Sequence, residues 1–137
     1  MKWLGLLVAV FAPLILTGCP NNWDGALFNN AGEAVEVFSF EHGTVAPNQF
    51  VRFKGLDRGV RISSGTCDYR YEVPAELFSR RFYDFGRMTD RGFQYQLERD
   101  FSINLLPPDY TGDAPAPSAL FLKRDGFPMH PIERKCR

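Results

Sequence analysis

The stretch DYRYEV, residues 68–73, decides the fold class because apolar and charged side chains alternate along it. Tyr69, Tyr71 and Val73 share one side, and the residues between them are all charged. A period of two is the period of a β-strand, and this alternation is typical of a strand with one buried face and one face in water. The stretch therefore predicts a sheet that presents aromatic side chains to a core.

The segments that precede this stretch are also expected to form strands. Residues 27–40 contain two apolar runs separated by a turn at residues 29–33, which predicts a β-hairpin. Residues 49–54 and 60–63 alternate as residues 68–73 do, with the apolar positions facing inward.

Strand patterns continue toward the C-terminus. In residues 93–105 every odd position except Arg99 is apolar, so the segment is either one strand bent at residues 99–100 or two strands that meet there. The proline-rich residues 107–117 predict a loop, because proline lacks the backbone donor of a sheet ladder. Residues 118–124, SALFLKR, predict a nearly continuous buried strand.

A single segment has a helical pattern. Pro74 precedes residues 75–83, in which Phe78 and Phe82 lie one helical turn apart. About six to eight short strands with at most one short helix predict a mainly β fold. We expect a small antiparallel β-sandwich or partly open barrel that forms one domain over residues 27–137.

The N-terminal residues have a different composition. Lys2 is followed by an apolar run over residues 4–16, and the run ends at a polar edge that contains Cys19. This layout is that of a secretory signal. The run of about 13 residues is too short to span a bilayer, which takes about 20.

The tetrapeptide LTGC at residues 16–19 resembles the lipobox of bacterial lipoproteins. In that family the cysteine thiol is alkylated with diacylglycerol, the leader is cut before the cysteine, and the new amine is acylated. The resemblance implies that residues 1–18 are a signal peptide, that Cys19 carries the lipid that anchors the protein to a membrane, and that residues 19–26 are a short tether.

The residue after the lipidated cysteine guides sorting in the same family. An aspartate there retains a lipoprotein at the inner membrane, and this chain has Pro20. The resemblance therefore implies a position on the periplasmic side of the cell envelope, with the outer membrane favoured over the inner.

Two cysteines remain once Cys19 is assigned to lipid. Cys67 and Cys136 form an even pair in a chain expected in an oxidising compartment, which predicts a disulfide. The bond would close a loop of about 70 residues and contribute roughly 4 kcal/mol. Two free thiols, or a metal pair with a histidine, are the alternatives, because the sequence does not show whether the α-carbons come within reach.

Composition and motifs exclude several functions. The 16 basic side chains are balanced by 16 acidic ones, so there is no electrostatic footprint for nucleic acid. Met129 and His130 are adjacent and would point to opposite faces of an extended segment, and no HExxH or CxxC motif occurs, so neither a metal nor another cofactor is predicted. No nucleophile or phosphate-binding motif is present either, and we predict that the protein is not an enzyme.

The segment 77–95 has the composition of an interaction surface. Its aromatic residues are interleaved with arginines that include Arg80, Arg81 and Arg87, and these residue types dominate binding hot spots. The simpler interpretation, which we favour for this segment, is that the aromatics fill the core and the arginines pair with nearby acids. We therefore expect a non-catalytic binding or structural module, with an envelope protein or glycan as partner; the alternative function is hydrolysis of an envelope polymer such as peptidoglycan.

Overall fold

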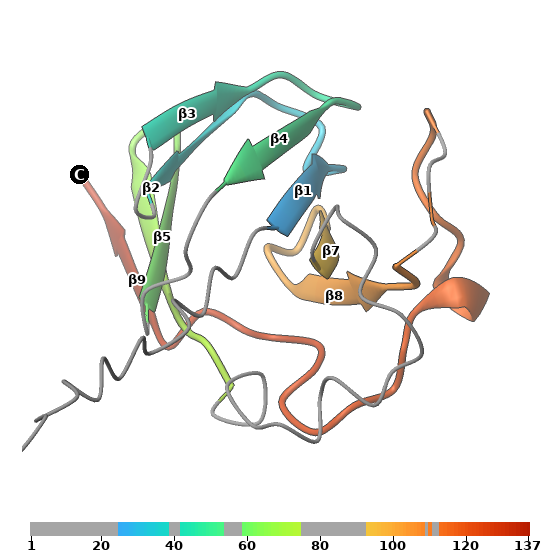
Figure 1. Cartoon of the computed structure of the whole chain (residues 1–137). Helices are drawn as coiled ribbons and strands as arrows, with labels where there is room; N and C mark the ends of the chain where they lie inside the picture. Colours follow the sequence, from blue (N-terminus) through green and yellow to red (C-terminus); the bar gives the residue numbers. More distant parts are fainter. Residues whose placement is uncertain (1–24, 39–41, 54–58, 75–92, 109, 111–112) are drawn as a thin grey trace, which may run out of the picture.

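The computed structural model describes residues 25–38, 42–53, 59–74, 93–108, 110 and 113–137. Within these segments nine strands form two sheets that pack face to face (Figure 1). The mainly β prediction is confirmed, and the described strands form a sandwich that is not closed into a barrel. The helix predicted over residues 75–83 lies outside the described residues.

The smaller sheet has the strand order β4-β1-β7-β8. Its strands are β1 (Gly25–Asn29), β4 (Phe50–Phe53), β7 (Phe93–Leu97) and β8 (Ile103–Leu106). Strands β1 and β7 are parallel, and the other neighbours in this sheet are antiparallel.

The larger sheet has the order β3-β2-β5-β6-β9 and is antiparallel throughout. Its strands are β2 (Val35–Phe38), β3 (His42–Val45), β5 (Gly59–Ser64), β6 (Cys67–Glu72) and β9 (Glu133–Cys136). None of the helical turns in the described part of the chain has the length and apolar character needed to cross a bilayer.

The inner face of the larger sheet follows the sequence pattern. Tyr69, Tyr71 and Val73 are buried, and so are Val60 and Ile62 on the neighbouring strand. These side chains meet Leu27, Tyr95, Leu97, Ile103 and Leu105 from the smaller sheet in one continuous core. The burial predicted from the period of two is confirmed here.

The predicted hairpin over residues 27–40 is wrong, because β1 and β2 belong to different sheets. The turn between them is present, but it carries the chain from one sheet to the other. Asn29, which is fully buried, accepts a hydrogen bond from the Ala31 N–H and donates to the carbonyls of Glu33 (2.7 Å) and Val45 (3.0 Å). The Asn29 side chain thus provides hydrogen-bond partners for backbone groups at the point where the chain passes from one sheet to the other.

The segment 93–105 forms two strands that meet in a tight turn. The Phe101 N–H donates to the Glu98 carbonyl (2.9 Å), and the Glu98 N–H donates to the Ser102 carbonyl (2.9 Å). Phe101 has a φ of 61°, the left-handed conformation that ends a three-residue hairpin loop of this kind and that normally requires glycine. A phenylalanine at this position is strained and must be held by other contacts.

Those contacts join the two sheets. The Phe101 ring stacks on the Tyr69 ring with centroids 3.9 Å apart and an interplanar angle of 7°. The Tyr71 hydroxyl donates a hydrogen bond to the Phe101 carbonyl (2.7 Å). Burial raises the pKa of Tyr71 well above its ordinary value, so the hydroxyl keeps the proton that it donates.

The buried strand predicted over residues 118–124 is wrong. Ser118–Leu120 form a 3-10 turn without buried residues, and the following segment makes one backbone hydrogen bond to β8, from the Leu122 N–H to the Leu105 carbonyl (2.9 Å). The segment before it is held by Gln96, whose side chain both donates to the Ala116 carbonyl (3.1 Å) and accepts from the Ala116 N–H (2.7 Å). The backbone at Ala116 is therefore bound to a side chain of β7, immediately before the residues for which the sequence predicts a strand.

We expect Phe101→Gly to be less destabilising than Phe101→Ala by about 1 kcal/mol, although it removes one more carbon atom. Both variants lose the stack on Tyr69, at a cost of roughly 2–4 kcal/mol, but only glycine relieves the positive φ. Urea unfolding of the oxidised protein measures the difference. At Leu97, which is buried in β7, the order of the same two variants should reverse; an identical order at both positions would contradict the role of φ.

We also expect Asp100 to make stability depend on pH in the acid range. Its carboxylate accepts hydrogen bonds from the Ser102 hydroxyl (2.7 Å) and the Ser102 N–H (2.9 Å), which hold the pKa of Asp100 below its ordinary value. A lowered folded-state pKa contributes stability above the unfolded pKa of about 3.9, and the contribution is lost as the pH falls through the folded value. The unfolding free energy of Asp100→Asn should therefore fall less than that of the wild type between about pH 6 and pH 2. Urea unfolding at several pH values measures this difference, and the same pH dependence in both proteins would contradict the prediction.

Candidate functional site

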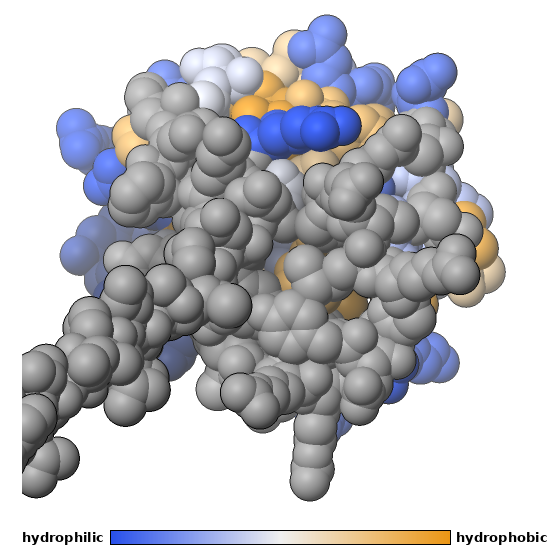
Figure 2. Space-filling model, in the orientation of Figure 1, coloured by the Kyte–Doolittle hydropathy of each residue, from blue (hydrophilic) through white to orange (hydrophobic). Residues whose placement is uncertain are grey.

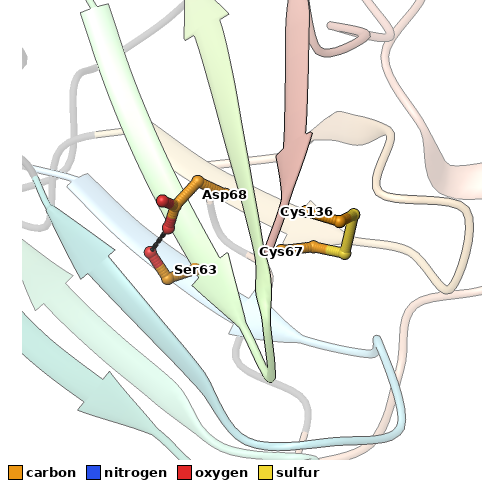
Figure 3. The surroundings of a disulfide bond; sticks show 4 residues. All are labelled: Ser63, Cys67, Asp68 and Cys136. Atoms are coloured by element: carbon orange, nitrogen blue, oxygen red, sulfur yellow. Dashed lines mark hydrogen bonds between the residues drawn. A yellow bond between two sulfur atoms is a disulfide. The ribbon is translucent and has the colours of Figure 1, made fainter.

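The predicted disulfide is present and joins neighbouring strands of the larger sheet (Figure 3). Cys67 on β6 and Cys136 on β9 are register partners with α-carbons 4.0 Å apart. The Arg137 N–H donates to the Thr66 carbonyl (3.0 Å), so Thr66 and Arg137 form a hydrogen-bonded pair. Such pairs alternate with non-hydrogen-bonded pairs along an antiparallel ladder, so Cys67 and Cys136 occupy a non-hydrogen-bonded pair, in which the α-carbons lie closer together. The free thiol and metal alternatives are excluded.

The two outer faces of the sandwich differ. On the smaller sheet Gln94, Gln96 and Asn104 point outward and are nevertheless buried. Gln94 donates to the Pro108 carbonyl (3.2 Å) and Gln96 to the Ala116 carbonyl (3.1 Å), so Pro108 and Ala116 cover part of this face. On the larger sheet the outward residues include Arg61 and Arg70, which are exposed. The larger sheet thus presents the open polar face. In Figure 2 hydrophilic residues lie along the side where Figure 1 places β5 and β9.

A row of polar side chains crosses this open face. The register pairs Glu36 on β2 with Ser63 on β5, and Ser63 with Asp68 on β6. The Ser63 hydroxyl donates a hydrogen bond to the Asp68 carboxylate, as Figure 3 shows. The next outward positions along the strands carry Phe38 and Arg61, which are also register partners.

These residues line a hollow of about 270 Å³ at the end of the β5–β6 hairpin. Glu36, Ser63 and Asp68 lie between two walls. One wall is Phe38 with the Arg61 guanidinium 4.1 Å above its ring centroid, and the other is the Gly65-Thr66 turn with Arg137. We call this the hairpin hollow.

The turn that forms one wall depends on a glycine. Gly65 has a φ of 54°, and Thr66 is the second residue of a two-residue loop between Ser64 and Cys67. A glycine with positive φ at the first loop position is typical of a type II′ hairpin turn, which matches the twist of the strands. The same turn brings Thr66 next to the disulfide, so the disulfide fixes the rim of the hairpin hollow.

The polar groups of the hairpin hollow are of several kinds. Ser63 donates to a carboxylate, and none of the described lining residues is a histidine or a lysine that could accept its proton. No group of three metal-ligating side chains occurs among the described residues. The lining offers carboxylate acceptors, guanidinium donors, hydroxyls and one aromatic ring.

The other site residues predicted from the sequence lie outside the described residues. This applies to Cys19, the lipidation residue, and to Arg80, Arg81 and Arg87, the suggested partner surface. Sequence reasoning did not single out the hairpin hollow. The available signal is positional, since Glu36 and Arg61 each lie between two buried residues of a strand and so point outward. Their strands β2 and β5 are neighbours in the sheet.

Comparison of the chain with protein-family models, curated proteins and solved structures finds no match.

Reduction of the disulfide should destabilise the protein by up to about 4 kcal/mol, because the bond closes a loop between residues 69 positions apart. Amide exchange should accelerate first in β9, an edge strand that pairs only with β6 among the described strands. Urea unfolding with and without a dithiol reductant measures the first effect. Cys67→Ser should reproduce it and Cys19→Ser should not; equal stability of oxidised and reduced protein would contradict the prediction.

Proposed function

We propose that this chain is an exported bacterial lipoprotein with a lipid anchor at Cys19, on the periplasmic side of the envelope and at the outer membrane in preference to the inner. The observation that carries the proposal is the LTGC sequence at residues 16–19, which directly follows a short apolar run. The modification chemistry requires a thiol at that position. Several acyl chains hold a protein firmly, whereas one chain binds only reversibly.

The disulfide supports export. Such bonds persist in oxidising compartments such as the bacterial periplasm and are rare in the cytoplasm. Cys67 and Cys136 hold an edge strand in place, so the bond is part of the sheet architecture. A structural bond of this kind fits a protein that folds after leaving the cytoplasm.

The anchor and the sandwich would lie close together. Strand β1 begins at Gly25, so the chain between Cys19 and the first described strand spans at most about 20 Å when extended. A tether of this length keeps the domain next to the membrane surface. The partner is therefore expected in the membrane-proximal layer of the envelope.

Within this setting we propose a non-catalytic binding role for the sandwich. The hairpin hollow supports this role because it gathers donors and acceptors on an open sheet face without a proton relay to its serine. The surface around Arg80, Arg81 and Arg87 is a second proposed contact for an envelope protein or glycan.

Intact-mass analysis of the membrane-extracted protein tests the anchor. We expect a chain that begins at Cys19 and carries added acyl mass, together with the two-proton loss of the disulfide. Cys19→Ser should retain the leader and lose the acyl mass, whereas Cys136→Ser should keep the acyl mass. A wild-type protein that retains Met1, or that has an unmodified Cys19, would overturn the proposal.

A further inference from the structure

We propose that the hairpin hollow binds one neutral sugar ring of an envelope glycan. This inference deepens the proposed binding role and rests on it for the biological source of the glycan. The binding chemistry itself depends only on the sandwich. Glu36, Asp68, Arg61 and Arg137 line the hairpin hollow on the outer face of the larger sheet.

The size of the hairpin hollow limits the ligand. Its volume of about 270 Å³ is below the range of about 300–1,000 Å³ that is usual for drug-sized ligands. The strand register fixes the backbone positions of Glu36, Ser63 and Asp68 at its floor. A single ring with short substituents matches this space, and an extended polymer would enter it with one residue only.

The charges in the hairpin hollow argue against a simple ion. Glu36 and Asp68 lie in the same cross-strand row and would repel an anion. Arg61 and Arg137 stand on opposite walls and would repel a cation. The described lining side chains therefore present charge of both signs, which suits a simple anion or a simple cation less well than a polar ligand without a net charge.

Hydroxyl groups satisfy both kinds of side chain. Each sugar hydroxyl is a donor and an acceptor, so neighbouring hydroxyls can donate to a carboxylate and accept from a guanidinium. Such hydrogen bonds are charge-assisted and are stronger than those between neutral groups. In the described part of the chain Arg137 has no side-chain partner, which leaves its donors available to a ligand.

The Arg61 guanidinium and the backbone of Arg137 are held in position before a ligand arrives. Arg61 lies 4.1 Å from the Phe38 ring centroid, a cation–π contact that restricts its guanidinium. The backbone of Arg137 is fixed by its hydrogen bond to Thr66 (3.0 Å) and by the adjacent Cys67–Cys136 bond. Preorganised donors lower the entropy cost of binding, so reduction of the disulfide is expected to weaken binding through Arg137.

Titration calorimetry on the full-length protein in detergent tests the proposal. The probes are trisaccharides of glucose, galactose, mannose and N-acetylglucosamine, with glycine as a zwitterion and sodium sulfate as an anion. We expect at least one trisaccharide to bind and neither glycine nor sulfate to compete. Asp68→Asn should weaken the binding about tenfold or more, since it removes a charged acceptor but keeps the shape and the Ser63 contact.

Matched variants separate a local effect from a general one. Glu72→Gln removes an exposed acid from the same strand outside the hairpin hollow and should leave the affinity unchanged. Arg137→Gln should weaken binding, whereas Arg70→Gln should not, because Arg70 pairs with Glu133 (3.2 Å) outside the hairpin hollow. Equal effects of Asp68→Asn and Glu72→Gln, no binding of any trisaccharide, or competition by glycine or sulfate would overturn the proposal. Intact mass of the same sample reports the lipid anchor independently, so the two proposals can fail separately.

Discussion

The contact of Phe101 with Tyr69 and Tyr71 is the constraint on which the sandwich depends. The β7–β8 turn belongs to the smaller sheet, and the two tyrosines belong to β6 of the larger sheet. A hydrophobic core alone would hold the sheets together without fixing how they face one another, since burial is not directional. The ring stack and the buried hydroxyl bond are directional, and they tie a strained turn to one strand.

Strand β6 therefore organises both the inside and the outside of the larger sheet. Its inward tyrosines hold the smaller sheet, its first residue Cys67 holds β9, and its outward Asp68 forms part of the hairpin hollow. Arg134 of β9 lies over the Tyr69 ring at 5.6 Å, which adds a second contact between the edge strand and β6. A change that shifts β6 would disturb the core and the candidate binding site together.

The covering of the smaller sheet explains why the candidate site lies on the other face. The Gln96 side chain forms two hydrogen bonds with the backbone of Ala116, and this backbone covers part of the outer face of the smaller sheet. The open face of the larger sheet carries charges of both signs on adjacent strands. Mixed charge of this kind favours solubility of such a face.

Alternation of apolar and charged residues is a local property, so the β class and the inward positions within residues 60–63 and 68–73 can be predicted from the sequence alone. The even pair Cys67 and Cys136 likewise predicts the disulfide. Long-range contacts separate β1 and β2 into different sheets, hold Phe101 at a position suited to glycine, and leave residues 118–124 outside the sheets. The hairpin hollow also depends on long-range contacts. The register that places Glu36, Ser63 and Asp68 in one row is a long-range pairing, whose free energy depends on partners that no local stretch of sequence contains.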